Sequence, residues 1–198
     1  MSFRIENKYR LSKGDLARLL ANLNNSNPKT LYPDRKVTSC YFDSNDFLMF
    51  HQSEEGVLPR KKIRARRYND GNQFTKEVKI SSIEGRYKTS ELIKDVSSLS
   101  QILDMQIMDQ DYGILLPSMF VSYRRSYIKI AGLRCTLDRD IEYKNLRNRS
   151  GLKFYDDECV FEVKADFKTS KDFIEKIFPM STSRFSKYSR AIIKFYQH

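Results

Sequence analysis

The sequence has little of several residues on which common enzyme and metal sites depend. It contains no tryptophan, seven glycines, two histidines and three cysteines among its 198 residues. The cysteines Cys40, Cys135 and Cys159 are far apart, form no Cys-x-x-Cys pair and adjoin no histidine, which argues against a zinc site. We expect all three to be small buried residues with free thiols, as is typical of proteins in a reducing compartment.

Several familiar motifs are missing as well. The chain has no Walker A loop, no G-x-G-x-x-G, no G-x-S-x-G and no H-E-x-x-H, and two histidines leave little basis for a histidine-based triad. No apolar run approaches the roughly 20 residues of a membrane-spanning helix. The sequence is charged from Arg4 onward, so we expect no signal peptide. These absences predict a soluble cytoplasmic protein.

Positive charge, by contrast, is abundant. The chain has 36 lysines and arginines against 25 aspartates and glutamates, a formal net charge of +11. Solubility is the simplest explanation of such an excess. The more specific interpretation is an anionic partner, which is a nucleic acid, a membrane surface or a phosphate-rich small molecule. The basic residues are interleaved with acidic residues and β-formers, which favours a folded basic site over an appended arm. With 40% apolar residues, the chain is expected to form one domain, residues 1–198, around a real core.

Charged residues recur two apart along strand-like segments. The four clearest pairs are Glu6 and Lys8, Arg64 and Arg66, Glu77 and Lys79, and Glu162 and Lys164. Residues i and i+2 of a strand point to one face of the sheet, so each pair puts two charges on the same side. The four pairs together predict a charged surface for a polyanion and its metal. A solvated sheet face with cross-strand Glu–Lys pairs is the alternative at this stage.

The periodicity predicts an antiparallel β protein with inserted helices. Strands are expected over 3–11, 37–42, 62–68, 74–80, 120–130, 133–141 and 160–165, with turns at 69–72 and 131–132. Helices are expected after the N-cap Ser12, near 47–50, and over 97–108, 171–178 and 185–196. About seven or eight strands with charges on one face predict a barrel of the α+β class. Its charged interior must hold water, ions or a ligand, because unpaired buried charges are costly.

The candidate site residues are the charged side chains of these strands. The basic set is Lys8, Arg64, Arg66, Lys79, Arg125, Arg134, Lys164 and Lys187, and the acidic set is Glu6, Glu77, Asp138, Asp140 and Glu162. Arginine binds phosphate oxygens with a planar fork, and lysine acts as a point charge. Glu162 is the favoured ligand for a hard cation, with Glu6 as a second candidate. A counter-ion role is favoured for Glu6, Glu77 and Asp138.

The start of the last predicted helix, residues 184–190, is a further candidate. A helix N-terminus that carries lysine and serine side chains is a natural phosphate contact. An ordinary amphipathic helix with its basic residues in water explains the same pattern equally well. Both interpretations stay open on spacing alone.

Short motifs along nearly the whole chain resemble, in their order, those of one family. They are Glu6-Asn7-Lys8-Tyr9, Ser39-Cys40-Tyr41-Phe42-Asp43, Ile63-Arg64-Ala65-Arg66-Arg67-Tyr68, Glu77-Val78-Lys79, Tyr123-Arg124-Arg125, Arg134-Cys135-Thr136-Leu137-Asp138, Phe161-Glu162-Val163-Lys164 and Phe185-Ser186-Lys187-Tyr188. The ordered set is similar to that of the VTC domain family, the polyphosphate polymerase branch of the CYTH-like triphosphate tunnel proteins.

The resemblance implies an eight-stranded antiparallel tunnel barrel, surrounded by helices, that binds ATP or polyphosphate. By motif position, the phosphate contacts would be Lys8, Arg64, Arg66, Lys79, Tyr123, Arg125, Arg134, Lys164, Ser186 and Lys187. Glu162 would hold Mn²⁺ or Mg²⁺. The catalytic set would be Lys8, Arg64, Arg66, Lys79, Arg125 and Glu162. Family members of this type build polyphosphate from the γ-phosphate of ATP and release ADP.

Two departures from the family pattern bear on the activity. Arg4 stands where the first of two glutamates is expected. That difference argues against triphosphate hydrolysis with two metals and agrees with the polymerase branch. After Lys79, both Arg86 and Lys88 lie near the expected basic element, so both are carried as phosphate contacts.

Other functions stay open at this stage. The alternatives are a triphosphatase acting on tripolyphosphate, nucleotides or thiamine triphosphate, and a non-catalytic polyphosphate or nucleotide sensor. No nucleic-acid partner is expected. Because we expect no phosphate-sensing or membrane domain in this chain, coupling to a membrane would need a membrane-protein partner. The sequence does not indicate which primer starts the polyphosphate chain, how long the product is, which metal is preferred or what the oligomeric state is.

Overall fold

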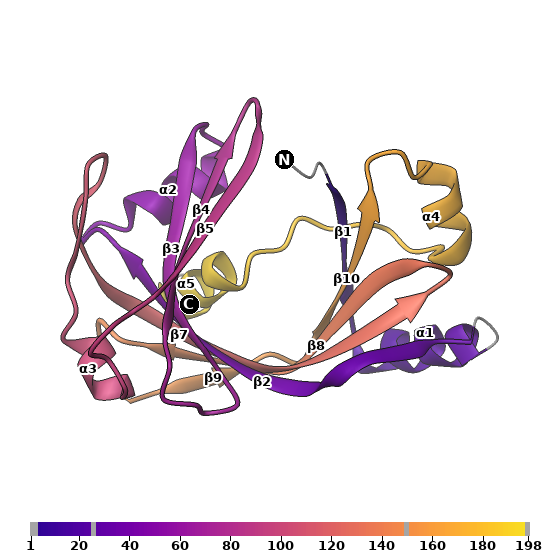
Figure 1. The fold of residues 1–198 in the computed structure, drawn as a ribbon, viewed down its shortest axis with the longest axis horizontal. Helices are drawn as coiled ribbons and strands as arrows, with labels where there is room; N and C mark the ends of the chain where they lie inside the picture. The colour runs from indigo at the N-terminus through magenta and orange to yellow at the C-terminus, as the bar shows by residue number, and fades with distance from the viewer. Residues whose placement is uncertain (1–3, 25–26, 149–150, 197–198) are drawn as a thin grey trace. The chain divides into compact units, whose positions relative to one another are not determined.

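The computed structural model describes residues 4–24, 27–148 and 151–196, which form an α+β fold. Eight strands follow one another in the sheet in the order β1-β10-β8-β7-β2-β3-β4-β5, and the short strands β6 and β9 pair with β7 and β8 (Figure 1). The predicted class, α+β with eight antiparallel strands and surrounding helices, is confirmed. Among the described residues, no helix combines the length and the apolar character needed to cross a membrane.

Ten strands and five helices occur along the described residues. The strands are β1 (Arg4–Leu11), β2 (Lys29–Asp43), β3 (Arg60–Tyr68), β4 (Thr75–Ser82), β5 (Gly85–Leu92), β6 (Ile107–Asp109), β7 (Gly113–Ile130), β8 (Leu133–Asn145), β9 (Lys153–Tyr155) and β10 (Cys159–Asp166). The helices are α1 (Lys13–Asn24), α2 (Leu48–Glu55), α3 (Leu99–Leu103), α4 (Lys171–Ile177) and α5 (Lys187–Tyr196). Each of the seven strands expected from the sequence overlaps a strand of the structure.

Several segments differ from their predictions. The helix expected over 97–108 is wrong in length, because α3 ends at the C-cap Asp104 and residues 107–109 pair with β7 as a strand. Strands β2 and β7 extend well beyond the segments expected over 37–42 and 120–130. Strand β5 is missed by the sequence prediction, because nearly all its residues are exposed and no apolar alternation marks it. Its pairing with β4 holds it in place.

The chain divides into two compact units. The first comprises the described residues of 1–35, 123–141 and 156–185, and the second those of 36–122, 142–155 and 186–198. Three strands, β2, β7 and β8, begin in one unit and end in the other. The sequence predicts that residues 1–198 form one domain, which means that the two units fold together. This stays a prediction.

In the first unit, one face of the sheet formed by β1, β10 and β8 is apolar. Antiparallel pairing places Tyr9 opposite Phe161 and Phe161 opposite Leu137, and all three side chains are buried. The Tyr9 and Phe161 rings also contact Phe178 at the end of α4, with 6.3 and 5.3 Å between ring centroids. Leu19 of α1 belongs to the same core. The residues between these positions therefore occupy the opposite face of the strands.

Helix α1 begins after the predicted N-cap Ser12, which forms a capping box with Asp15. The Ser12 hydroxyl accepts the backbone N–H of Asp15 at 3.1 Å, and the Asp15 carboxylate accepts the backbone N–H of Ser12 at 3.2 Å. These two bonds satisfy N–H groups that the first turn of a helix leaves without partners. The cap fixes where β1 ends and the helix over the apolar core starts.

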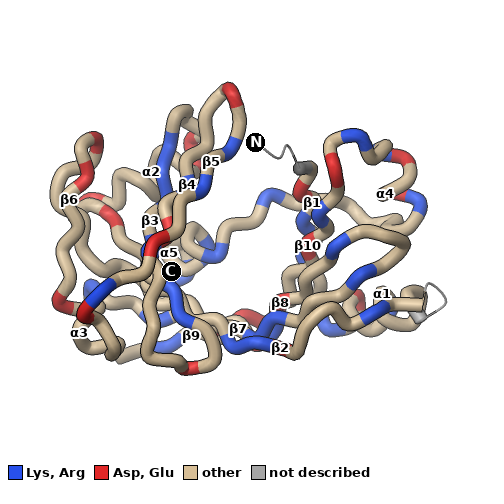
Figure 2. Tube along the Cα trace, in the orientation of Figure 1, with Lys and Arg blue, Asp and Glu red and all other residues tan. Residues whose placement is uncertain are grey.

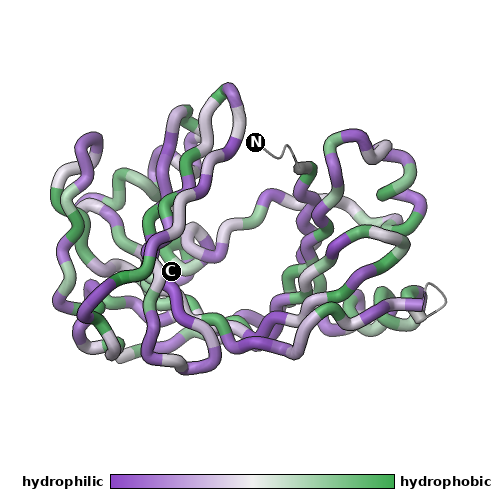
Figure 3. The backbone as a smooth tube through the Cα atoms, in the orientation of Figure 1, coloured by the Kyte–Doolittle hydropathy of each residue, from purple (hydrophilic) through white to green (hydrophobic). Residues whose placement is uncertain are grey.

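In the second unit, β3, β4 and β5 run side by side as two hairpins (Figure 1). Asn69 and Asp70 have φ values of 51° and 54° in the loop after β3, as a type I′ turn requires. Hydrophobic residues stand between hydrophilic ones along β3 and β4 (Figure 3). Ile63, Phe74 and Met49 are buried in the core on one face. The charged residues that alternate with Ile63 and with Val78 therefore lie on the other face, and they are Lys62, Arg64, Arg66, Glu77 and Lys79.

Candidate functional site

The residues predicted to bind phosphate and metal fall into two groups, one in each unit. The first unit contains Glu6, Lys8, Tyr123, Arg125, Arg134, Glu162 and Lys164. The second contains Arg64, Arg66, Lys79, Arg86, Lys88, Ser186 and Lys187. Figure 2 shows basic and acidic positions along β1 and β10 of the first unit and along β3 and β4 of the second. Each group is a candidate anion-binding surface.

Four charged residues of the first group alternate in sign across β1 and β10. Lys8 pairs with Glu162 in the antiparallel register, and Glu6 pairs with Lys164. All four share one face, since the residues between them face the apolar core. The Lys164 Nζ atom lies 3.3 Å from Glu6 Oε1 and 3.2 Å from Glu162 Oε1. One ammonium group is thus shared by two carboxylates.

Glu162 is an ionised carboxylate in a cationic environment. Its burial raises the pKa of the Glu162 carboxyl. The positive charges of Lys164, Lys8 and Arg125 lower that pKa by more, so it lies below the usual value. The Lys8 Nζ atom also donates to the backbone carbonyl of Phe185 at 3.0 Å. Glu162 therefore has the ionisation state that ligation of a hard cation requires.

Arg125 is held by a bidentate ion pair within the same unit. Its Nε and Nη2 atoms donate to the two carboxylate oxygens of Asp138 at 2.6 and 2.8 Å. Asp138 is 1% exposed, and the guanidinium carbon of Arg125 lies 5.2 Å from the centroid of the Tyr123 ring. The contacts of Asp138 are those of a counter-ion. They fix the plane of the Arg125 guanidinium.

Two further residues of β8 share the face of Glu162 and Lys164. Thr136 pairs with Glu162, and Arg134, which is exposed, pairs with Lys164. Thr136 is 3% exposed, and its hydroxyl has no hydrogen-bond partner among the described residues. Sequence reasoning misses Thr136, because a threonine in a strand carries no signal beyond its β propensity.

The carboxylates of the first unit fit a divalent cation that is held jointly with phosphate. Within the part of the chain that the structure describes, no group of three or more His, Cys, Asp or Glu side chains could hold a metal ion by itself. Mg²⁺, however, is usually bound through one or two carboxylates together with substrate phosphates. Glu162 and Glu6 supply such a pair, and the orphaned Thr136 hydroxyl supplies an oxygen opposite Glu162. Asp140 is exposed, and the side chain of Arg4 lies outside the described part.

In the second unit, one buried carboxylate gathers three cations. Glu77 Oε2 lies 2.7 Å from Arg64 Nε, 2.5 Å from Arg64 Nη2 and 3.7 Å from Arg66 Nη1. Its other oxygen accepts a hydrogen bond from Lys88 Nζ at 2.6 Å. Burial raises the pKa of Glu77, but the charges and hydrogen bonds of these cations, Arg64 first, lower it to about 2. Since one negative charge faces three positive ones, the cluster keeps an excess of positive charge.

The strand registers bring more cations to the same face. Lys62 pairs with Lys79 between β3 and β4, and Lys79 pairs with Lys88 between β4 and β5. Arg86 lies opposite Ser81, two residues beyond Lys79, and so belongs to this face as well. The side chains of Lys79, Arg86 and Lys88 are exposed. These three predicted phosphate contacts are therefore accessible to an anion.

Lys62 joins this cation face to the start of α5. Its Nζ atom donates to Ser186 Oγ at 2.8 Å. The same hydroxyl accepts the backbone N–H of Ser189 at 3.3 Å, in the first turn of α5, and Lys187 is the first residue of that helix. Sequence reasoning misses Lys62, although it continues the alternation of cations along β3.

Tyr41 of β2 lies beside the same cluster. Arg64 Nη1 donates to the Tyr41 hydroxyl at 2.8 Å. The Tyr41 ring stacks on Tyr188 of α5, with 4.9 Å between the centroids and 17° between the planes. Tyr188 in turn donates its hydroxyl proton to Asp43 at 2.6 Å, and Asp43 accepts the backbone N–H of Met49 in α2. Buried polar contacts thus join β2, α2 and α5.

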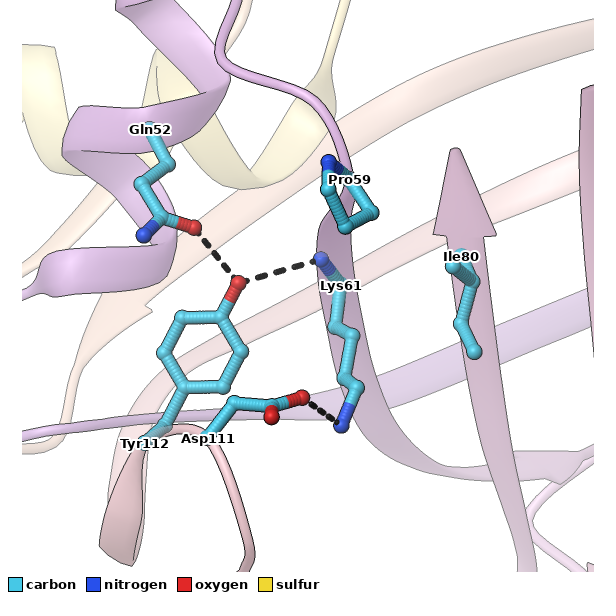
Figure 4. A pocket seen from close by; sticks show the side chains of 6 residues that line it. All are labelled: Gln52, Pro59, Lys61, Ile80, Asp111 and Tyr112. Carbon is cyan, nitrogen blue, oxygen red and sulfur yellow. Dashed lines mark hydrogen bonds and ion pairs between the residues drawn. The ribbon is translucent and has the colours of Figure 1, made fainter. Parts of the chain in front are cut away.

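A small pocket of about 210 Å³ lies on the other face of β3 and β4 (Figure 4). It is lined by Gln52, Pro59, Lys61, Ile80, Asp111 and Tyr112. Lys61 and Ile80 are register partners and point away from the cation face. Figure 4 shows the Tyr112 hydroxyl between Gln52 and the backbone N–H of Lys61, while Lys61 Nζ lies 2.5 Å from Asp111. Because the charge of Lys61 is neutralised, this pocket is not a candidate anion site.

Comparison with protein families gives a match over nearly the whole chain. The VTC domain model matches residues 3–196. No curated protein sequence matches the chain. The match covers every predicted site residue of both units, from Glu6 to Lys187.

Solved structures share the fold at low sequence identity. A candidate adenylate cyclase from Bacillus halodurans is 18% identical, with a TM-score of 0.59 and 98% of each chain covered. The candidate adenylyl cyclase HpAC1 from Hippeastrum, described as having a dominant triphosphatase activity, is 15% identical, with a TM-score of 0.54 over 96% of this chain and 95% of that one. A conserved hypothetical protein from Pyrococcus furiosus is 14% identical, with a TM-score of 0.55 over 94% and 99%. At these identities the comparison shows a shared fold.

Proposed function

The chain belongs to the VTC domain family, and from that premise we propose that it is a metal-dependent polyphosphate polymerase. It would transfer the γ-phosphate of ATP to a growing polyphosphate chain and release ADP. The observation that carries the proposal is the face of β1 and β10 on which Lys164 bridges Glu6 and Glu162. Two carboxylates that already share one cation are suited to exchange it for a divalent metal and its phosphate.

In the proposed reaction the protein forms no covalent bond to the substrate. Phosphoryl transfer depends on positioning and on neutralising charge that spreads over the phosphate oxygens. Arg64 and Arg66 offer planar forks for those oxygens, while Lys8 offers a point charge. The attacking terminal phosphate of the growing chain is already ionised near neutral pH, so the transfer needs no general base. The remaining proposed contacts are Lys79, Arg86, Lys88, Tyr123, Arg125, Arg134, Lys164, Ser186 and Lys187.

Glu162 and Glu6 are the residues that would hold Mn²⁺ or Mg²⁺ in the first unit. When bound, such an ion neutralises negative charge on the phosphate oxygens. Glu162 is kept ionised by its neighbouring cations, so it is ready to ligate without losing a proton. Lys164 would give up its carboxylate partners and become available to phosphate. Asp138 keeps Arg125 in place throughout.

A triphosphatase is the second candidate function. It is favoured by the shared fold of HpAC1, for which a dominant triphosphatase activity is described. Water, rather than a phosphate oxygen, would then attack the triphosphate. Arg4 in place of the first of two glutamates speaks against hydrolysis with two metals. A non-catalytic sensor would bind the same anions without turnover.

The cytoplasm is the proposed location of the reaction. Cys40, Cys135 and Cys159 are free and buried. Burial raises the pKa of all three thiols, so each stays protonated near neutral pH. Free, unreactive thiols are typical of proteins in reducing compartments, which supports this location.

The first experiment is to incubate the purified protein with ATP and Mn²⁺, and to analyse the products by gel electrophoresis and by an assay for free phosphate. A ladder of long phosphate chains, together with ADP, is the expected result. Free phosphate without chains would show that the protein is a triphosphatase and not a polymerase. If ATP binds but neither product forms, the protein would be a non-catalytic sensor.

The metal assignment has its own test. Glu162→Gln should abolish turnover and weaken Mn²⁺ binding measured by calorimetry, while the circular dichroism spectrum stays that of the wild type. Glu158→Gln is the matched control, because Glu158 forms an exposed ion pair with Arg10 outside the proposed site. An active Glu162→Gln variant with wild-type Mn²⁺ affinity would contradict the assignment of Glu162 as a metal ligand.

A further inference from the structure

Tyr41 has no role in the reaction proposed above, yet it is fixed firmly against the cation cluster of the second unit. It is 7% exposed, and its ring stacks on Tyr188 of α5. Its backbone carbonyl accepts a hydrogen bond from Ser118 Oγ at 3.0 Å. Arg64 Nη1 donates to its hydroxyl, and the guanidinium carbon lies 5.6 Å from the ring centroid. The Tyr41 side chain is thus held in place by its neighbours, and its hydroxyl contacts Arg64, a proposed phosphate-binding residue.

Positive charge surrounds the Tyr41 hydroxyl. The charged groups around it are Arg64 and Arg66 of β3, Lys187 of α5 and, through the two arginines, Glu77 of β4. Burial of the ring raises the pKa of Tyr41. The charges of Arg64, Arg66 and Lys187, with the hydrogen bond from Arg64, lower it by more, to about 7. Tyr41 therefore changes between its neutral and its ionised form near neutral pH.

The neighbouring tyrosine has the opposite behaviour. Burial, the charge of Asp43 and the hydrogen bond to it raise the pKa of Tyr188 well above its ordinary value. Tyr188 therefore stays neutral and serves as a fixed stacking surface. Of the two stacked rings, Tyr41 alone changes its charge near neutral pH.

We infer that neutral Tyr41 positions Arg64 for phosphate, and that ionised Tyr41 takes Arg64 away from it. The neutral hydroxyl accepts one hydrogen bond from Arg64 and retains a proton that it can donate to a phosphate oxygen. The phenolate is instead an anion that competes with phosphate for the same guanidinium. The inference rests on the proposed role of Arg64 in binding phosphate, and it makes that binding depend on pH near neutrality.

Linkage sets the direction of this dependence. An anion bound at Arg64 disfavours the phenolate, so bound phosphate raises the pKa of Tyr41 above about 7. Affinity is therefore greatest below the pKa of the free protein and falls as the pH rises through it, by at most about tenfold per pH unit. Terminal phosphates also titrate near this pH, so a variant without the phenol must supply the baseline.

Tyr41→Phe removes the hydroxyl and keeps the ring that stacks on Tyr188. Tripolyphosphate binding, measured by calorimetry from about pH 6 to about pH 9, should show the wild-type affinity falling about tenfold or more relative to Tyr41→Phe. The ultraviolet absorbance of tyrosinate should reveal one tyrosine that titrates near neutral pH in the wild type and is missing from Tyr41→Phe. Tripolyphosphate should move this titration to higher pH. Tyr112→Phe, on the other face of β3, is the control and should retain both signals.

The outcomes separate the inference from the proposed function. A near-neutral tyrosine titration that survives in Tyr41→Phe, or the same pH dependence of affinity in both proteins, would overturn the inference alone. A wild-type protein that shows the titration but binds no tripolyphosphate at any pH would overturn the proposed function and the coupling with it. The titration of the wild type with and without tripolyphosphate needs no variant. A titration that tripolyphosphate fails to shift, although it binds, would by itself overturn the inference.

Discussion

The carboxylate of Glu77 and the guanidinium of Arg64 form a buried ion pair in which Oε2 lies 2.5 Å from Nη2. Only 5% of the Glu77 side chain and 14% of the Arg64 side chain are exposed. The same carboxylate also contacts Arg66 and Lys88. One negative charge thus holds together three positive charges that would otherwise repel one another. The surplus makes this face of the second unit a surface that attracts a polyanion.

Glu77→Gln is expected to destabilise the protein in a pH-dependent way. The carboxyl titrates near 4.5 in the unfolded chain, and the folded state lowers its pKa to about 2. Its contribution is therefore fully present above about pH 4.5 and is lost as the pH falls towards about 2. At neutral pH the variant should lose about 2–3 kcal/mol of unfolding free energy in urea denaturation. The difference from the wild type should shrink in acid.

Glu91→Gln is the matched control for this change. Glu91 pairs with Lys76 at 3.3 Å, but 70% of the Glu91 side chain is exposed. Its loss should cost no more than about 1 kcal/mol, as is typical of surface ion pairs. Equal losses for the two variants at neutral pH, or a loss in Glu77→Gln that ignores pH, would contradict the counter-ion role.

Thr136→Val tests whether the orphaned hydroxyl serves a ligand. That hydroxyl is buried without a partner among the described residues, so the folded protein bears the cost of its desolvation. A methyl group in its place should leave the free energy of unfolding unchanged or raise it by about 1 kcal/mol. Affinity for Mn²⁺ in the presence of tripolyphosphate should fall by about tenfold, measured by calorimetry. Metal affinity should therefore fall without a loss of stability.

The control for Thr136 is a second buried threonine. Thr38→Val, in the second unit, removes a hydroxyl from a buried strand position and should leave Mn²⁺ affinity as it is. If Thr136→Val binds Mn²⁺ as tightly as the wild type, its hydroxyl serves no ligand.

The spacing of charges predicts the faces of the strands well and their contacts poorly. Glu6 and Lys8 lie on the face opposite the apolar core, as expected, because alternation is a local property of a strand. The ion pairs of Lys164 with Glu6 and Glu162 depend on the register between β1 and β10. These two strands are far apart in the sequence. Register is fixed by the whole sheet, so the spacing within one strand does not contain it.

The missed residues are missed for physical reasons. Lys62 follows Arg60 and Lys61, and three consecutive cations conceal which of them belongs to the charged face. Thr136 and Tyr41 carry no charge in the sequence, and they become notable through burial and through the groups that the fold places beside them. Residues whose role depends on neighbours far along the chain need the structure.

Lys62→Met is expected to weaken anion binding by the second unit. Lys62 lies on the face of Arg64 and donates to Ser186. Methionine keeps the apolar stem and removes the charge. Affinity for tripolyphosphate should fall by about tenfold in calorimetry, since a charge-assisted contact is lost, and its salt dependence should become shallower.

Lys76→Met provides the comparison for Lys62. Lys76 lies on β4 two residues from Val78, on the face opposite Glu77 and Lys79, and its ion pair with Glu91 is exposed. Its removal lowers the net charge by the same amount and should change tripolyphosphate affinity by less than about twofold. Equal effects of the two changes would mean that total charge, and not the cation face, decides the binding.

The two units are expected to unfold together. Strands β2, β7 and β8 each run through both units, so the continuous backbone of three strands couples the unfolding of one unit to that of the other. The sequence has no tryptophan, which allows one to be introduced as a local probe. Phe167→Trp would report on the first unit and Tyr155→Trp on the second, and both positions are more than half exposed. Fluorescence in urea should give the same midpoint for both variants.

Circular dichroism of each tryptophan variant supplies the control for that experiment, because it follows the backbone of the whole chain. Coincident fluorescence and dichroism curves with one slope would mean that the surface of both units is exposed in a single step. Separate midpoints for Phe167→Trp and Tyr155→Trp would contradict one domain over residues 1–198. The long strands would then have to break within their length, near the residues where each passes from one unit to the other.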